Sequence, residues 1–134
     1  MNVLKSDSMP VRTSEDIVLV RQAVRSKAVA LGFGLVDQTK IVTASSELAR
    51  NTLDYGEGGT VEIAVVQNGV RAGLRLVFED HGPGIVDLEL ALKDGYTTGQ
   101  GMGLGLSGAK RLSHEFEIFS KPGEGTRVSI LRWK

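Results

Sequence analysis

Apolar residues recur at helical spacing in the first part of the chain and follow a strand pattern afterwards. Thr13 and Asp16 form a capping pattern that predicts the start of a helix, and Gly32 predicts its end. A second helix is expected from about Leu35 to Leu53, where a glycine-rich stretch follows. The apolar stripes of these helices are Ile17, Val20, Val24, Ala28 and Leu31 in the first, and Ile41, Ala44 and Leu48 in the second.

Two β-hairpins are predicted in the remainder of the chain. Residues 60–67 and 72–79 are rich in β-branched side chains, and the Asn68-Gly69 pair between them is a strong hairpin signal. Residues 116–120 and 126–133 form a second pair of strands around a Pro-Gly-Glu-Gly turn. The sequence therefore predicts antiparallel strands in its second half.

The segments outside these patterns complete the expected fold. Residues 10–12 predict a short edge strand, and residues 80–102 predict a long loop with one helical turn near 88–93. A third helix is expected to begin in a glycine run and to continue through Leu112. Helices and antiparallel strands in this order predict an α+β fold, a two-layer sandwich with the helices on one face of the sheet, in one domain over residues 1–134.

Composition narrows the classes of function. The 16 Lys and Arg residues balance the 16 Asp and Glu residues, so we expect neither a nucleic-acid nor an anionic-membrane partner. Without cysteine there is no thiol nucleophile and no thiolate metal site. No apolar run approaches the ~18 residues that span a bilayer, so a cytoplasmic location is expected. Of the 17 glycines, eight lie between Gly82 and Gly108, so the glycine excess has a local cause.

The second predicted helix carries a carboxylate and an amide one turn apart. Glu47 and Asn51 are at positions i and i+4, which places their side chains on one face about 6 Å apart. An amide oxygen beside a carboxylate suits Mg²⁺, which takes one or two protein ligands and completes its shell with phosphate and water. Asn51 would then be the direct ligand and Glu47 a general base. A solvated helix face is the alternative explanation for the pair.

A second candidate segment follows the strand predicted at 72–79. Asp80 directly after a buried strand can accept a hydrogen bond from a ligand amine. Gly82 and Gly84 allow the backbone to turn sharply and to approach a flat ligand. An ordinary turn at the end of a strand is the alternative.

The third segment is a run of alternating glycines at Gly99, Gly101, Gly103 and Gly105. Residues 103–108 match the dinucleotide-binding pattern, but no strand precedes them and too few residues follow for that fold. The P-loop pattern fails as well, because its Lys and Ser/Thr are not in place. A glycine loop that leads into a helix N-terminus can bind phosphate, with Lys110 as a further charge. A mobile loop without a ligand explains the four alternating glycines poorly.

The order of these segments resembles that of the GHKL ATPases, which include gyrase, Hsp90, histidine-kinase catalytic domains and anti-sigma-factor kinases. The shared order is Glu-x-x-x-Asn on a helix, Asp-x-Gly-x-Gly after a strand, Gly-x-Gly-x-Gly before a helix, and Gly-Glu-Gly-Thr near the end. Residues 31–38, 46–51 and 103–112 are most similar to the RsbT-type branch of small serine/threonine kinases. The resemblance covers nearly the whole chain and implies the GHKL sandwich, a mixed sheet with about three helices on one face.

The resemblance also implies ATP and Mg²⁺ as cofactors and suggests a role for each candidate residue. Asp80 would bond the adenine amine, Thr126 would support the adenine site, and Asn51 would hold Mg²⁺. Glu47 would be the catalytic base that takes the proton of the acceptor hydroxyl. The other residues expected to bind the cofactor are Gly82, Gly84, Gly99, Gly101, Gly103, Leu104, Gly105 and Lys110.

The activity implied by the resemblance is phosphorylation of a serine or threonine on a STAS-domain antagonist protein. Such kinases are partner-switching regulators of sigma-factor stress responses or of stressosome output. A PP2C-type phosphatase and a sigma factor are the further partners that the resemblance suggests. The alternative is an ATP-gated anti-sigma-factor or regulatory binding protein that transfers little phosphate. Glu47 argues against that alternative, because an adenine site alone needs no carboxylate on its metal face.

Overall fold

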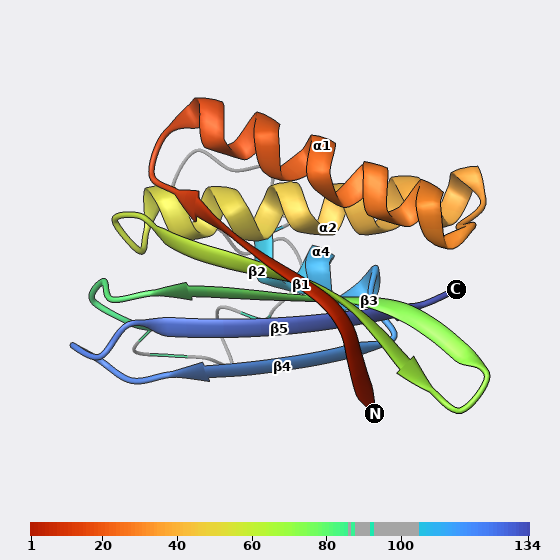
Figure 1. Ribbon diagram of the computed structural model, residues 1–134. Helices are drawn as coiled ribbons and strands as arrows, with labels where there is room; N and C mark the ends of the chain where they lie inside the picture. The colour runs from red at the N-terminus through yellow and green to blue at the C-terminus, as the bar shows by residue number, and fades with distance from the viewer. Residues whose placement is uncertain (86, 88–91, 93–104) are drawn as a thin grey trace.

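The strands form one antiparallel sheet that supports the rest of the molecule (Figure 1). The computed structural model describes residues 1–85, 87, 92 and 105–134. Within these residues the strands are β1 (Asn2–Val11), β2 (Gly59–Asn68), β3 (Arg71–Asp80), β4 (Glu115–Ser120) and β5 (Thr126–Trp133), in the spatial order β1-β2-β3-β5-β4. Both predicted hairpins are confirmed, because β2 pairs with β3 and β4 pairs with β5.

The expectation of a mixed sheet is wrong for the described strands, since all four pairings are antiparallel. Two of the pairings are hairpins, and a short turn can join strands only in antiparallel directions. Between β1 and β2 the chain runs out along one helix and back along another. It therefore re-enters the sheet at the end it left, where Val11 is paired with Gly59.

The helices α1 (Ser14–Leu31), α2 (Leu35–Asp54) and α4 (Gly105–Arg111) cover one face of this sheet, which confirms the two-layer α+β sandwich (Figure 1). The apolar stripes of α1 and α2 pack on the side chains of β3 that face the helices, including Leu74, Leu76 and Phe78. Gly32 ends α1 in the left-handed conformation, with φ of 87°. None of the helices in the described ranges combines the length and the apolar character that a bilayer-spanning segment needs.

A complete capping box begins α1. The Thr13 hydroxyl accepts a hydrogen bond from the Asp16 N–H (3.2 Å), and the Asp16 carboxylate accepts one from the Thr13 N–H (3.1 Å). We expect Thr13→Ala to lower the free energy of unfolding by about 1 kcal/mol, or Tm by about 3 °C, because an N–H at the helix start loses its acceptor. Thermal unfolding followed by circular dichroism measures this shift. Ser14→Ala is the control, and an equal loss in both variants would contradict the assignment of the cap.

The end of the sheet where β4 starts and β5 finishes is held by polar contacts. The buried Arg132 donates to the Asp37 carboxylate of α2 and to the Leu112 carbonyl just after α4 (2.9 Å). The hydrogen bond from Arg132 holds the pKa of Asp37 below its ordinary value. Nearby, His114 Nδ1 accepts from the Trp133 N–H (2.8 Å), and burial is the main cause that lowers the pKa of His114. These contacts join the sheet to both α2 and α4.

Candidate functional site

The opposite end of the sheet carries a row of polar side chains on three adjacent strands. Asp80 at the end of β3 is paired with Thr126 at the start of β5, and Thr126 is paired with Ser120 at the end of β4. Directly opposed residues of neighbouring strands project from the same face of a sheet. Asp80 alternates with Phe78 and Leu76, which pack against the helices, so this polar row lies on the helix-covered face.

Asp80 is the buried acid of this row, with 7% of its surface exposed. Its Oδ1 accepts two backbone hydrogen bonds, from the Gly82 N–H (3.0 Å) and from the Thr126 N–H (3.2 Å). Among the described residues, no donor reaches the other oxygen, Oδ2. The two N–H donors fix the orientation of the carboxylate and leave Oδ2 able to accept a hydrogen bond from a ligand.

Three glycines surround the Asp80 carboxyl group and its backbone. A Cβ atom at Gly56 would overlap the carboxylate itself, and one at Gly125 would overlap the Asp80 carbonyl. A Cβ at Gly82 would lie 2.7 Å from the Gly56 carbonyl oxygen. Only glycine allows the end of α2, the turn after β3 and the start of β5 to approach this closely. We call Asp80, Thr126, Gly56, Gly82 and Gly125 the Asp80 cluster.

The turn that follows Asp80 is fixed to the β4–β5 hairpin. Gly84 has φ of 77°, and a Cβ there would overlap the Lys121 carbonyl. The Gly123 N–H donates to the Pro83 carbonyl (2.7 Å), and the Ile85 N–H donates to Ser120 Oγ (2.8 Å). The predicted turn residues Gly82 and Gly84 therefore lie beside Asp80, in a turn that the β4–β5 hairpin holds in place.

Glu47 and Asn51 lie one turn apart on α2, and both side chains are half-buried. The buried residues Leu48 and Ala49 between them face the core, so the pair occupies the border between the buried and exposed faces of the helix. Gly105, the first residue of α4, lies against the same place, because a Cβ on it would come within 4.0 Å of Asn51 Nδ2. The start of α4 therefore lies beside the amide of this pair.

The structure describes only the last residue of the glycine run, Gly105. Gly99, Gly101, Gly103 and Leu104 lie outside the described residues, as does nearly all of the helical turn expected near 88–93. Lys110 is exposed in the last turn of α4, where a cation stabilises the helix dipole. Of the residues expected to contact the phosphates, Gly105 lies beside Asn51. Lys110 lies near the other end of the seven-residue helix α4.

The donor set around Asn51 fits a hard divalent cation that is shared with phosphates. Within the described ranges no three His, Cys, Asp or Glu side chains gather closely enough to hold a metal ion by themselves. Mg²⁺ retains several waters and is commonly held by one or two protein oxygens together with substrate phosphates. The Asn51 side chain beside Glu47 meets that requirement. The described residues around it do not provide enough ligands to hold the ion without phosphates and water.

Two residues of this site were not predicted from the sequence. Gly56 belongs to the glycine-rich stretch that ends the second predicted helix, and the structure shows that it also packs against the Asp80 carboxylate. Ser120 was the last residue of a predicted strand, yet its hydroxyl contacts Ile85, Gly125 and Thr126. The local signal for Gly56 was three glycines within four positions, more than a helix stop needs. For Ser120, a hydroxyl at a strand end beside a glycine turn was the only signal.

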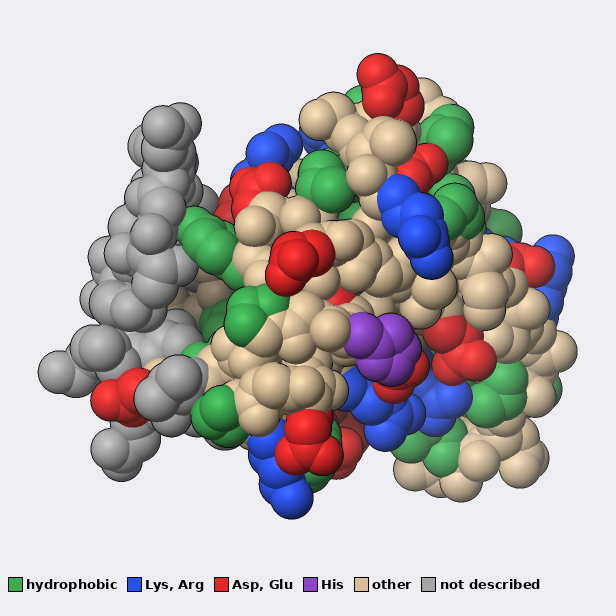
Figure 2. Space-filling view, turned by 90° about the vertical axis from the view of Figure 1, so that its left-hand side faces the viewer, with side chains coloured by type: hydrophobic (Ala, Val, Ile, Leu, Met, Phe, Trp, Pro, Cys, Tyr) green, Lys and Arg blue, Asp and Glu red, His purple; other side chains and the backbone are tan. Residues whose placement is uncertain are grey.

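Charges of both signs surround this end of the molecule (Figure 2). Acidic and basic side chains alternate with apolar ones across the described surface in that view, and neither sign forms a broad patch. This distribution agrees with the balanced net charge of the chain. Affinity for a ligand at this end therefore depends on specific contacts rather than on a broad field of one sign.

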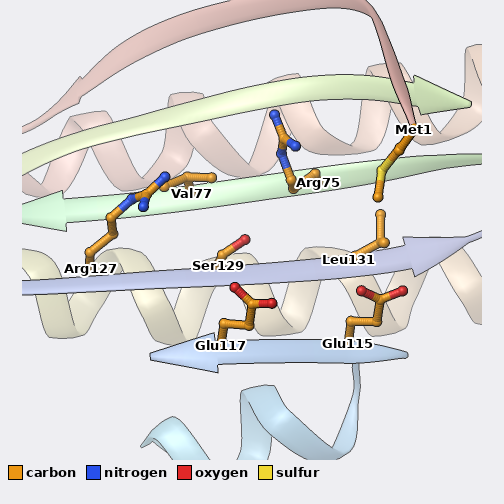
Figure 3. A pocket seen from close by; sticks show the side chains of 8 residues that line it. All are labelled: Met1, Arg75, Val77, Glu115, Glu117, Arg127, Ser129 and Leu131. Carbon is orange, nitrogen blue, oxygen red and sulfur yellow. The ribbon is translucent and has the colours of Figure 1, made fainter. Parts of the chain in front are cut away.

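A separate cavity of about 250 Å³ lies on the other face of the sheet (Figure 3). Arg75 and Arg127 line one side, and Glu115 and Glu117 of β4 point into it from the other side. Each arginine also has an acidic neighbour outside the cavity, at 3.7 Å and 3.8 Å. The sheet separates this cavity from the helix-covered face that carries Asp80, so it is no part of the candidate site.

Comparison with protein-family models gives one match over the larger part of the chain. Residues 36–134 match the model described as "Histidine kinase-, DNA gyrase B-, and HSP90-like ATPase". The matched region contains all members of the Asp80 cluster as well as Glu47 and Asn51.

Curated proteins give full-length similarity. The serine/threonine-protein kinase RsbT of Bacillus subtilis (strain 168) is 46% identical over 123 residues, which is 92% of each chain. An anti-sigma F factor of Anoxybacillus flavithermus is 29% identical over 126 residues, 89% of this chain and 85% of that protein. The chain is thus similar to both a kinase and an anti-sigma factor over nearly its whole length.

Solved structures support the fold. The RsbU and RsbW domains of Rv1364c from Mycobacterium tuberculosis match 97% of this chain and 33% of that one, with a TM-score of 0.65 and 20% identity. The SiaB-SiaC complex from Pseudomonas aeruginosa matches 98% of this chain and 91% of that one, with a TM-score of 0.54 and 16% identity. At these identities the structures establish the common architecture alone.

Proposed function

Because the chain belongs to the histidine kinase-, DNA gyrase B- and HSP90-like ATPases, and within them to the family of the serine/threonine-protein kinase RsbT, we propose that it phosphorylates a STAS-domain antagonist protein. The γ-phosphoryl group of ATP would move to a serine or threonine hydroxyl of that protein. The observation that carries the proposal is the position of Glu47, a carboxylate one turn from Asn51 on the helix whose end packs on Asp80.

The Asp80 cluster is suited to an adenine ring. Asp80 Oδ2 is the acceptor available for the exocyclic amine, because Oδ1 is already bonded to two backbone N–H groups. Close packing of three segments at Gly56, Gly82 and Gly125 holds this carboxylate in a fixed position. The Thr126 N–H orients Asp80, and Thr126 is proposed to support the same end of the base.

Asn51 is the residue proposed to hold Mg²⁺, and Gly105 borders the same place. When bound, the ion neutralises charge on the phosphates of ATP during transfer. The remaining residues of the glycine run, Gly99, Gly101, Gly103 and Leu104, stay predictions as phosphate contacts, as does Lys110. Their proposed role rests on the order of the motifs in the sequence.

Glu47 is proposed to accept the proton of the acceptor hydroxyl. The half-buried Glu47 carboxylate lies one turn from Asn51 on α2. If Asn51 holds Mg-ATP, this carboxylate would be close to the γ-phosphate and to an incoming hydroxyl. In phosphoryl transfer a positioned carboxylate orients the acceptor hydroxyl and accepts its proton, in addition to the electrostatic stabilisation of the phosphates. The substrate therefore has to bring a mobile serine or threonine to this face of α2.

A second function is favoured by the relatives that are anti-sigma F factors. In that case the chain holds a sigma factor, or a PP2C-type phosphatase, in an ATP-dependent manner and transfers little phosphate. Both readings require the Asp80 cluster, whereas only transfer requires Glu47. A cytoplasmic location is proposed with either function, because ATP and these partner classes are found there.

Incubation of the purified chain with Mg-ATP and a STAS-domain protein from the same genome tests the proposal. We expect a mass increase of one phosphate on the STAS protein, located on a serine or threonine by peptide mapping. The control is the same STAS protein with that residue changed to alanine, which should remain unmodified. Tight ATP binding without phosphate on any STAS protein of that genome would refute the kinase proposal and leave the binding function.

We expect Gly56→Ala to weaken ATP binding at least tenfold, because the new methyl group overlaps the Asp80 carboxylate and must displace it. Isothermal titration with ATP and Mg²⁺ measures the affinity. Gly34→Ala is the matched control, since Gly34 precedes the same helix, has an ordinary φ of −67° and has open space around it. Equal affinity in both variants would contradict the proposed role of the cluster.

A further inference from the structure

Ser120 joins three segments at the end of the polar row. Its Oγ accepts a hydrogen bond from the Ile85 N–H (2.8 Å), lies 3.0 Å from the Gly125 carbonyl oxygen and lies 2.9 Å from Thr126 Oγ1. Ile85 belongs to the turn after Asp80, and Gly125 and Thr126 begin β5. The Ser120 hydroxyl therefore contacts both segments that orient the Asp80 carboxylate.

The chemistry of these partners determines which hydroxyl donates. A backbone N–H can only donate, so Ile85 uses one acceptor position of Ser120. A backbone carbonyl can only accept, so Gly125 takes the single proton of the Ser120 hydroxyl. Ser120 has no second proton for Thr126. The hydrogen bond between the two hydroxyls is then donated by Thr126 and accepted by Ser120.

This arrangement leaves Thr126 Oγ1 with lone pairs and no free proton. Asp80 Oδ2, on the residue paired with Thr126 across the strands, is also an acceptor. Two acceptors side by side match a ligand group that carries two N–H bonds. They disfavour a ligand carbonyl oxygen in the same place, because that oxygen would also be an acceptor and no proton would lie between it and the two protein oxygens.

We propose that Ser120 is a specificity-determining positioning residue, which fixes the hydroxyl proton of Thr126 so that the site selects a 6-amino purine over a 6-oxo purine. The inference rests on the proposed binding of ATP at Asp80. It assigns to Ser120 a role through Thr126 and no contact with the base. Loss of the Ser120 hydroxyl frees the Thr126 proton, which can then be donated to a carbonyl oxygen.

The test compares the affinities for ATP and for inosine triphosphate, which carries a carbonyl at position 6. In the unaltered chain we expect ATP to bind at least about 100-fold more tightly, as in sites built around specific hydrogen bonds. Ser120→Ala should reduce that ratio about tenfold, the size expected for one hydrogen bond, while Ser120→Thr should restore it. Ser113→Ala removes another half-buried hydroxyl that bonds a carbonyl (2.7 Å, Ala109), and it should leave the ratio unchanged.

A double-mutant cycle separates this role from a merely structural one. In a Thr126→Val background, Ser120→Ala should no longer change the ratio, because the residue through which it acts is gone. Thr126→Val alone should also lower the ratio, so the proposal stays testable even if Ser120→Ala fails to fold. A wild-type ratio in folded Ser120→Ala or in Thr126→Val, or an effect of Ser120→Ala that persists in the valine background, would overturn it. Absence of any ATP binding by the unaltered chain would instead refute the proposed function.

Discussion

Asp80→Asn should abolish measurable nucleotide binding while the fold remains intact, with a loss of affinity of at least about 100-fold. The asparagine oxygen can keep the two hydrogen bonds that Oδ1 accepts from Gly82 and Thr126. The amide nitrogen then replaces Oδ2, so a donor faces the amine of the base where an acceptor stood. The loss follows from reversing one hydrogen bond at a buried position.

Equilibrium titration with ATP and Mg²⁺ measures this loss, and circular dichroism verifies the fold. Asp54→Asn is the matched control, because Asp54 is an exposed acid at the end of α2 that lies 3.8 Å from the exposed Arg50. We expect ATP affinity near that of the unaltered chain in this control. A folded Asp80→Asn variant that binds ATP as tightly as the control would remove Asp80 from the adenine site.

Glu47→Ala should show the opposite pattern: ATP affinity is retained, and the rate of phosphoryl transfer falls by about 10²- to 10⁴-fold, the range for loss of a general base. Glu47 lies within α2, whereas Gly56, which packs on Asp80, follows the end of that helix. Removal of the carboxylate leaves the adenine contacts in place. Only the step that needs a proton acceptor is affected.

Single-turnover transfer from a preformed complex with ATP separates the chemical step from binding. Glu117→Ala is the control, since its carboxylate faces the cavity on the other side of the sheet. That variant should transfer phosphate at the rate of the unaltered chain. If Glu47→Ala lost ATP binding and transfer by the same factor, Glu47 would be a binding residue and not the base.

Signals between residues close together in the sequence were sufficient to predict most of the fold. The capping box at Thr13, the left-handed Gly32 and the Asn68-Gly69 turn act within a few residues, so the bounds they predict for α1, β2 and β3 hold within one or two residues. Strand β1 was underestimated, because most of its side chains are exposed on the sheet edge and show no alternation. The relative direction of the strands depends on the path of the chain between them, which the spacing of apolar residues alone does not reveal.

The contacts within the candidate site were harder to predict from the sequence than its motifs. Asp80, Thr126, Glu47 and Asn51 could be named because their residue types and order carry chemistry. The roles of Gly56 and Ser120 depend on contacts between segments tens of residues apart in sequence, such as the end of α2 with the end of β3. Such contacts exist only after the sheet has formed, so neither local pattern nor composition predicts them.

The central claim is that this site transfers the γ-phosphoryl group of ATP to a protein hydroxyl. The most direct measurement gives the chain ATP labelled either at the γ- or at the α-phosphorus, together with Mg²⁺ and a STAS-domain protein, and follows the label. We predict that label from the γ-position alone appears on a serine or threonine of the STAS protein, and that Glu47→Ala, still saturated with ATP, suppresses it. Full transfer by the ATP-saturated Glu47→Ala variant, or no γ-label on the STAS protein with the unaltered chain, would contradict the account.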